Sequence, residues 1–423
     1  MKKSLLAIAI AAAVPAVASA QVTVGGLMDI GVANVDNGAK SKIMTTTGDR
    51  SSNNLRFTGM EDIGGGLKAM FHMELGFDVD NGLFNGGLTG PASGSGSGAL
   101  PILNSGRQTS SATVTPISGF GFTRRSVVGL QGGFGEIRGG RDYTPIFLAV
   151  NGNSIHGTSG YASTLTYFNG NSLASSTSGT GITGHDVRFS NAFFYDSPVM
   201  GGFKLTGAYT NAAGFEESYN TKNGVGSSFA AVYNTGPIYA QVSMSTQKLE
   251  DGTGAVLVNS TGPGKRDVTA YGAKYKVGDF ELAAGGQTAK VKNGLGSCSV
   301  PGNTSATGVC SPNVFNGNEV KNEVVFYGVA YTFGPNRLSV QGANVKVSGS
   351  TGSAGAGGDK DYSALTVLLN HSLSKRTSLY ANYGKISNDA KQNVLIRSNG
   401  AAFATAALGA DPSSFGVGLV HSF

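Results

Sequence analysis

The sequence predicts an all-β protein, a 16-stranded antiparallel transmembrane β-barrel with short periplasmic turns and long external loops. Three observations lead to this fold class. Apolar and polar residues alternate with a period of two in sixteen separate segments. The connections between these segments alternate between short and long. The N-terminus resembles an export signal, and no later stretch is long and apolar enough for a transmembrane helix.

The export signal comprises three parts in the expected order. Met1-Lys2-Lys3 is followed by an apolar run from Leu5 to Val17 and by Ala18-Ser19-Ala20, the A-x-A pattern of a signal-peptidase site. The apolar run is too short to span a membrane comfortably. We therefore expect residues 1–20 to be a cleaved signal peptide and residues 21–423 to form the barrel domain.

The alternation is clearest from Leu55 to Phe77. Every odd position from Leu67 to Phe77 is apolar, whereas most even positions, such as Lys68 and Glu74, are polar. This period of two is typical of a strand with one apolar face. The glycines at 64–66 suit a tight turn because glycine readily adopts positive φ.

The same pattern recurs along the chain. The sixteen predicted strands lie near residues 22–34, 52–62, 67–79, 122–131, 136–143, 187–196, 202–211, 227–234, 237–247, 267–276, 279–291, 322–333, 336–347, 362–372, 377–386 and 413–423. Long polar segments near 35–51, 80–121, 144–186, 212–226, 248–266, 292–321, 348–361 and 387–412 alternate with short turns. An even strand number places both termini in the periplasm and lets the last strand pair with the first.

The composition fits a barrel that meets lipid on one face and water on the other. The chain has 66 glycines, 13% charged residues and a mean hydropathy of −0.03. A secreted glycine-rich β-solenoid would share these totals, but it would show a short fixed repeat, and none is present. The net charge of +6 is modest, and basic residues inside a barrel make no exposed surface for nucleic acid.

Cationic side chains are predicted to line the lumen. Strand alternation aims Arg56, Lys68, Arg124, Arg138 and Arg188 inward, and Arg141 ends a predicted strand, so its facing stays open. The long segment from Thr144 to His185 contains no Asp or Glu. We expect these six residues to form an anion-preferring pore constriction, opposed by the lumen acids Asp29, Glu74 and Asp78. The alternative is that the arginines pair with lumen acids and brace the barrel.

Cys298 and Cys310 are the two cysteines of the chain. Because both lie in one polar external segment of an exported protein, they predict a local disulfide. A metal site is disfavoured because no histidine or acidic residue is near them, and the five histidines show no metal-ligand spacing. We expect no metal and no cofactor.

Several motifs resemble the general porins of Gram-negative bacteria, especially those of β-proteobacteria. The resemblance covers nearly the whole chain in order and rests on Gly59-Met60-Glu61-Asp62-Ile63-Gly64-Gly65-Gly66-Leu67-Lys68-Ala69, Gly139-Gly140-Arg141-Asp142-Tyr143-Thr144-Pro145, Tyr195-Asp196-Ser197-Pro198, Leu373-Ser374-Lys375-Arg376-Thr377 and the terminal Phe423. It implies a homotrimer of sixteen-stranded barrels, each narrowed by its third external loop and passing small hydrophilic solutes by diffusion.

The resemblance also carries over to single residues. Arg124 and Arg188 match positions where related porins place the arginine wall of the constriction, and the barrel-assembly machinery is implied to read Phe423. An outer-membrane location further implies contact with membrane lipid and lipopolysaccharide. Such porins commonly carry an arginine at the place of Asn54, whereas here the cation is Arg56.

Three classes of function therefore compete. A diffusion channel accounts for export, strand count, loop asymmetry and inward cations together. A surface adhesin or structural barrel accounts for the long loops and gives the inward arginines no role. An outer-membrane enzyme needs serine and histidine held together, which the sequence does not indicate, so we expect no catalytic activity.

Overall fold

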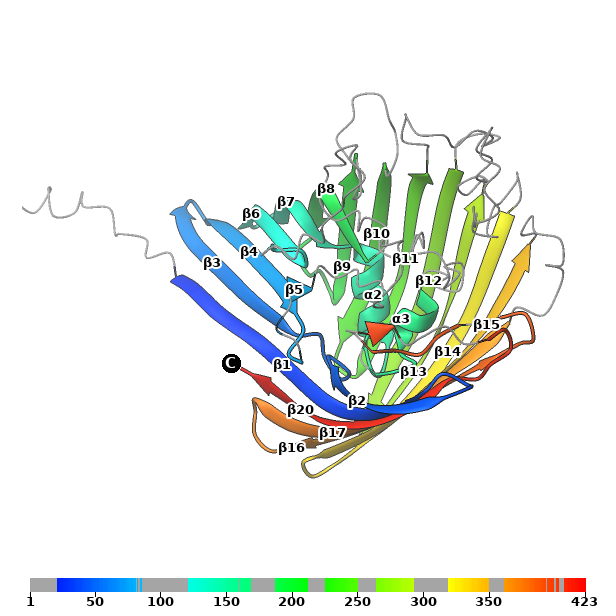
Figure 1. Cartoon of the computed structure of the whole chain (residues 1–423). Helices are drawn as coiled ribbons and strands as arrows, with labels where there is room; N and C mark the ends of the chain where they lie inside the picture. Colours follow the sequence, from blue (N-terminus) through cyan, green and yellow to red (C-terminus); the bar gives the residue numbers. More distant parts are fainter. Residues whose placement is uncertain are drawn as a thin grey trace, which may run out of the picture.

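Sixteen long strands form one closed antiparallel ring in the computed structural model (Figure 1), which confirms the predicted fold class. The structure describes residues 21–80, 82, 84–85, 121–158, 160–168, 187–211, 225–249, 264–292, 319–349, 361–392, 394–398, 401–402 and 407–423. The barrel strands are β1 (Gln21–Asp36), β3 (Asn54–Gly64), β4 (Leu67–Phe77), β6 (Arg125–Gly132), β7 (Gly135–Tyr143), β8 (Arg188–Asp196), β9 (Phe203–Thr210), β10 (Gly226–Thr235), β11 (Ile238–Leu249), β12 (Gly264–Val277), β13 (Phe280–Lys292), β14 (Glu319–Phe333), β15 (Asn336–Gly349), β16 (Tyr362–Ser372), β17 (Thr377–Asn388) and β20 (Ser413–Ser422).

The ring closes between the first and last strands, as predicted. Residues 27–36 of β1 pair with 413–422 of β20, and residues 21–27 of β1 pair with 54–60 of β3. Phe423 extends this pairing, because its N–H donates to the carbonyl of Gly26 at 3.1 Å and its own carbonyl accepts from the Gly26 N–H at 3.0 Å. Because no strand edge is left open in the ring, the barrel satisfies its backbone groups internally, as lipid requires.

The seven predicted short turns are confirmed at one end of the barrel and the long connections lie at the other. Gly65 and Gly66 have φ of +62° and +76°, the conformation that favours glycine. By the rule for outer-membrane barrels, the short turns mark the periplasmic end.

The side chains of the strands alternate between the two faces of the wall. Along β14, Val325, Tyr327 and Tyr331 are exposed on the outer face, whereas Val324 and Phe326 are buried on the inner face. Tyr331 stacks on Phe280 of the neighbouring strand at 4.7 Å between ring centroids, close to the periplasmic turns. This outer apolar surface with aromatic residues near its periplasmic edge is the one that a lipid-facing barrel needs.

The first long connection differs from the prediction. The predicted loop 35–51 is wrong over β2 (Ser41–Thr47), which folds back and pairs with residues 30–36 of β1. The external half of β1 therefore has β2 beside it, whereas the periplasmic half has β3. Since β2 occupies this edge, the chain from 48 to 53 must cross from β2 to β3.

The third long connection runs inside the ring. It contains two helices, α2 (Pro145–Asn153) and α3 (Thr164–Tyr167), and Figure 1 shows both within the barrel. Thr144 caps α2, because its side chain accepts the N–H of Phe147, and Pro145 suits the first turn. We call its described residues, 144–158 and 160–168, the inner loop.

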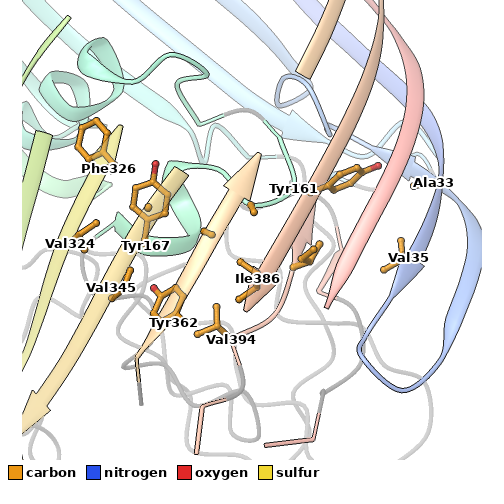
Figure 2. Close-up of a cluster of buried hydrophobic side chains, with 14 residues drawn as sticks. Ala33, Val35, Tyr161, Tyr167, Val324, Phe326, Val345, Tyr362, Ile386 and Val394 are labelled. Carbon is orange, nitrogen blue, oxygen red and sulfur yellow. The ribbon is translucent and has the colours of Figure 1, made fainter. Parts of the chain in front are cut away.

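Apolar packing holds the inner loop against the wall. Tyr161 and Tyr167 of the loop pack with Phe326, Val345 and other inward residues of β14 to β17 (Figure 2). A second cluster joins α2 to β12 and β13 through Ile146, Phe147, Val150, Val268, Ala270 and Ala289. The expectation of a polar inner face is thus wrong for this part of the wall, whose inward apolar side chains lie under the loop and away from water.

The described residues also contain three short strands, β5 (Phe84–Asn85), β18 (Arg397–Ser398) and β19 (Ala401–Ala402). Within these residues, no helix combines the length and apolarity that a membrane span needs. The predicted signal peptide and the cysteine pair Cys298 and Cys310 lie outside the described residues, so both stay predictions.

Candidate pore constriction

Three of the predicted arginines meet around the hydroxyl of Tyr143, where β6, β7 and β8 reach their external ends. Nη2 of Arg124 and Nη2 of Arg188 each donate to Tyr143 Oη at 2.7 Å. Arg141 lies beside them and donates from Nε to the carbonyl of Thr123 at 2.6 Å. We call Arg124, Arg141 and Arg188 the arginine cluster.

The arginine cluster carries more positive than negative charge. Among the described residues, the carboxylate that contacts it is Glu74, which accepts from Arg124 Nε at 2.5 Å and lies 3.4 Å from His72 Nε2. The guanidinium of Arg188 also stacks over the Tyr143 ring, with its Cζ 4.3 Å from the ring centroid. A stack of this kind stabilises a cation without neutralising it. Three guanidiniums against one carboxylate leave an electropositive wall.

A bulge between β7 and β8 shapes this wall. The register shifts between Gly140 and Asp142, and Asn191 opposite has a positive φ of 49°, which asparagine tolerates better than most residues. Bulges re-aim side chains near functional sites. Here Nη1 of Arg141 donates to Ser190 Oγ at 2.6 Å, next to the bulged residue, and this contact holds Arg141 close to Arg188 and Tyr143.

Strand β6 begins one residue after Arg124, so the prediction that strand alternation aims Arg124 into the lumen is wrong. The predicted strand 122–131 is shorter in the structure and begins at Arg125. Arg125 is therefore the residue that alternation aims inward, opposite Glu74, and it pairs with Asp142 through an Nε to Oδ1 distance of 2.7 Å. Arg124 precedes the strand and reaches the cluster from the adjoining bend.

Arg138 is inward and 4% exposed, but carboxylates surround it. Its Nε donates to Asp142 Oδ2 at 2.7 Å, and its Nη1 donates to Glu136 Oε1 and Asp196 Oδ2 at 2.9 Å each. The side chain also lies 5.2 Å from the Phe194 ring centroid. This is the bracing arrangement that the sequence left open, and a buried cation held in this way needs all of its partners.

Arg56 and Lys68 lie on the lumen face at different depths. Arg56 is exposed and stands opposite Glu74 in the register of β3 and β4, beside the arginine cluster. Lys68 is exposed opposite Asp62, next to the periplasmic turn. The structure therefore places Arg56 near the cluster and Lys68 at the periplasmic mouth.

The inner loop is fixed to the far wall by polar contacts as well as apolar ones. Oε1 of Gln341 on β15 accepts from the Ile155 N–H and from Ser154 Oγ, both at 2.9 Å. Ser339 Oγ lies 2.8 Å from Nε2 of His156, and burial lowers the pKa of His156 to about 3. His156 is therefore neutral at physiological pH, and the loop between Thr144 and His185 brings no carboxylate to the pore.

A further cation, Arg50, enters the lumen from the segment between β2 and β3. Asp29 accepts the backbone N–H groups of Arg50 and Ser51 at 2.6 Å each and the hydroxyl of Tyr380 at 2.8 Å. Asp49 accepts from Tyr161 Oη of the inner loop at 2.6 Å. The expected lumen acid Asp29 thus holds a chain segment and is 0% exposed.

Sequence reasoning missed three residues of this lumen, Arg50, Arg125 and Tyr143. Tyr143 directly follows Arg141-Asp142 in the motif already noted, so its aromatic ring beside two charges was an available signal. Arg125 was missed because the predicted strand 122–131 begins too early, which assigned the inward position to Arg124. No local pattern marks Arg50, because its place depends on the folding back of β2.

The family model and the curated relatives that match this chain are all porins or major outer membrane proteins. The family model described as Gram-negative porin matches residues 6–391. The chain is 27% identical over 434 residues to outer membrane porin protein 32 of Delftia acidovorans, with all of both chains covered. It is 30% identical over 261 residues to the major outer membrane protein P.IB of Neisseria gonorrhoeae, covering 59% of this chain and 60% of that protein.

Solved structures agree on the fold. The anion-selective porin from Comamonas acidovorans superposes with a TM-score of 0.71 at 23% identity, covering 96% of this chain and 100% of that one. OmpT of Vibrio cholerae in its trimer form gives 0.60 at 11% identity, covering 96% and 99%. With the family match over most of the chain and a closed ring of sixteen strands around an inner loop, this chain belongs to the Gram-negative porin family of the outer membrane.

Proposed function

We propose that this porin passes small hydrophilic solutes with a preference for anions, set by the arginine cluster together with Arg56. The observation that carries the proposal is the convergence of Arg124 and Arg188 on one tyrosine hydroxyl, with Glu74 as the contacting carboxylate. The field of such a wall is strengthened between low-dielectric surfaces. At physiological salt the Debye length is about 8 Å, so this field reaches across a narrow pore. The anion-selective porin from Comamonas acidovorans, which shares this fold, supports the same direction.

The test is the reversal potential of single channels in a potassium chloride gradient. We expect chloride to permeate better than potassium, with a preference that shrinks as ionic strength rises. Replacing Arg124 and Arg188 together by serine should weaken or reverse the preference and raise the conductance, because two large cations leave the lumen. A cation-selective wild type, or a double variant with unchanged selectivity, would place the selective charge elsewhere.

The same bilayer recording distinguishes a channel from the alternative, an adhesin or structural barrel. Such a barrel needs no open pore, so a purified protein that inserts without conductance would favour it. We also propose that the protein has no catalytic activity, and a hydrolase screen of the purified protein is expected to show no turnover.

Lipopolysaccharide is a proposed partner, and a row of outward lysines supports it. On the outer face near the external ends of β11 to β14, Lys248 lies opposite Lys265, and Lys290 lies opposite Lys321. Like charges directly opposite each other destabilise a strand pair. The carboxylates of Asp267, Glu319 and Glu323, at 3.0, 4.0 and 2.6 Å from Lys265, Lys290 and Lys321, offset part of this repulsion. Lipid phosphate at the outer leaflet is a further anion that these lysines could bind. Lys290→Gln with Lys321→Gln should lower the lipopolysaccharide that copurifies, whereas Lys276→Gln near the periplasmic turn should not.

Two further proposals concern the ends and loops. Residues 1–20 are proposed as a cleaved signal peptide, which N-terminal sequencing of the mature protein would test by finding Gln21 first. Cys298 and Cys310 are proposed to form a disulfide within one external loop. Its reduction should leave the melting of the barrel unchanged, because the bond would constrain the loop alone; free thiols in non-reduced protein would contradict the pairing.

A further inference from the structure

A second group of cations lines a cavity between the inner loop and the barrel wall. The cavity has a volume of about 310 Å³. Its polar and charged lining residues are Arg50, His156, Lys274, Glu281, Arg337, Ser339 and Asn370. They come from the segment after β2, from the inner loop and from β12, β13, β15 and β16.

Positive charge exceeds negative charge in this lining. Glu281 is the one carboxylate among the described lining residues, and it faces both Arg337, at 3.1 Å from Nη2, and Lys274, at 3.5 Å from Nζ. Lys274 and Arg337 remain 26% and 32% exposed, so solutes in the lumen can reach them. Two cations share the carboxylate of Glu281, and Arg50 adds a third positive charge to the lining.

Arg50 is held at this cavity against electrostatic cost. Burial first, and then the like charge of Arg337, lower the pKa of the Arg50 guanidinium, while Asp29 acts in the opposite direction. Asp29 fixes the backbone at Arg50 and Ser51, so the segment cannot turn away easily. A cation kept beside another cation gains most from an anion that bridges the two.

The wall behind the cavity is rigid. Tyr239 donates to the carbonyl of Ala149 in α2 at 2.9 Å, and Lys274 Nζ lies 5.9 Å from the Tyr239 ring centroid. On the other side His156 is bonded to Ser339, whose hydroxyl in turn donates to the carbonyl of Leu368 at 3.2 Å. The cations therefore project from a fixed frame and not from mobile loop tips.

This cavity is separate from the arginine cluster. In the ring of sixteen strands, β15 stands eight strands from β7 in either direction, so Arg337 lies on the wall opposite the arginine cluster. Arg337 and Glu281 each follow a periplasmic turn by one residue or two, whereas the arginine cluster lies at the external ends of β6 to β8. A solute from outside would meet the cluster first and the cavity second.

We propose that Arg50, Lys274 and Arg337 form a binding site for a small multivalent oxyanion, a phosphate or dicarboxylate, on the periplasmic side of the constriction. Two guanidiniums and an ammonium match the several negative oxygens of such an anion, which chloride lacks. The inference rests on the proposed anion preference and adds a discrete anion-binding site to the channel. It makes the channel one that retains multivalent oxyanions briefly during passage.

The experiment measures the block of chloride current by inorganic phosphate in bilayers that contain the wild-type porin. We expect phosphate to reduce the current with saturation. Arg337→Gln and Arg50→Gln should each raise the half-blocking concentration about tenfold, the loss typical of one charged hydrogen bond. Glu281→Gln should lower it, because the competing carboxylate is gone.

Lys276→Gln is the matched control, since Lys276 is an exposed lysine on the same strand as Lys274 and does not line the cavity. It should leave the half-blocking concentration unchanged. Phosphate block that survives both arginine variants and Glu281→Gln, or that disappears only with Arg124→Ser and Arg188→Ser, overturns the site. Absence of block with the chloride preference intact overturns the site alone, whereas loss of the preference itself overturns the proposed function.

Discussion

At the residue scale, the hydroxyl of Tyr143 organises the arginine cluster. It accepts from two guanidiniums, and its ring stacks under Arg188 and against Phe147 of α2, 5.1 Å between centroids. Two guanidiniums repel each other at this distance. The hydroxyl oxygen of Tyr143 holds them together because it accepts a hydrogen bond from each. Tyr143 thus ties Arg124 and Arg188 to the base of the inner loop.

Tyr143→Phe tests this role. The ring and its stacking are kept, but two charged donors lose their acceptor, so Arg124 and Arg188 should spread apart and the chloride preference should fall. The reversal potential in a salt gradient is the measurement. Tyr195→Phe is the control, because Tyr195 lies outside the lumen and donates to the carbonyl of Phe134. Equal reversal potentials for wild type and Tyr143→Phe would remove Tyr143 from the selectivity mechanism.

His156 predicts a pH dependence for the inner loop. Its pKa is lowered to about 3 by burial, against about 6.5 for a free imidazole. Between pH 6.5 and 3 the undocked loop therefore binds more protons than the docked loop, and docking weakens as pH falls. Channels recorded at pH 4.5 should show more current noise than at pH 7.5.

The control for this titration is His156→Gln, which keeps a hydrogen-bonding side chain near Ser339 and cannot be protonated. Its current noise should change less between the two pH values. Wild-type noise that does not depend on pH, or noise that depends equally in the variant, would assign the acid response to another group.

At the element scale, one glutamine of the barrel wall makes four hydrogen bonds to the inner loop. Gln341 accepts from Ser154 Oγ and the Ile155 N–H, and its Nε2 donates to Tyr167 Oη and to Thr164 Oγ1. The side chain is 3% exposed, so its partners would be left buried without it. Buried polar groups that lose a partner cost about 1–3 kcal/mol each.

Gln341→Ala should therefore loosen the inner loop while the barrel stays intact. We expect faster amide hydrogen exchange in residues 153–168, higher current noise, and unchanged exchange in β15. Gln241→Ala is the matched variant, because Gln241 accepts from Ser243 of its own strand. Equal exchange in the two variants would mean that apolar packing alone fixes the loop.

At the scale of the whole molecule, the terminal residue is expected to act in assembly more than in conduction. Phe423 adds two backbone hydrogen bonds to Gly26, and its ring lies over that glycine. These contacts are a small part of a ring of sixteen strands. We propose that the chain forms a homotrimer and that the barrel-assembly machinery recognises Phe423.

Deletion of Phe423 should reduce the amount of heat-modifiable trimer in the outer membrane, while the few assembled channels conduct normally. The measurement is the trimer band on unheated gels together with single-channel conductance. Phe423→Tyr keeps the aromatic ring and should restore assembly. Normal surface levels of the truncated protein, or a wild type that is monomeric before heating, would contradict this view.

The sequence alone determined the barrel, the strand count and the sorting of loops, because the period of two is local and each short turn carries its own glycine, proline or charged residues. It also predicted that Arg56 and Arg188 face the lumen, since facing follows from alternation once a strand is placed. Even the wrong start of β6 moved the inward position by a single residue, from Arg124 to Arg125.

Only the tertiary structure decided which partners each of the inward charges meets. Arg138 is neutralised by carboxylates from its own strand and from β8, and Arg50 reaches the lumen because β2 folds back on β1. The inner faces of β14 to β17 are apolar where Tyr161 and Tyr167 cover them. These outcomes depend on contacts between residues far apart in the chain, and Coulomb and packing energies depend on distance in space, which no local pattern encodes.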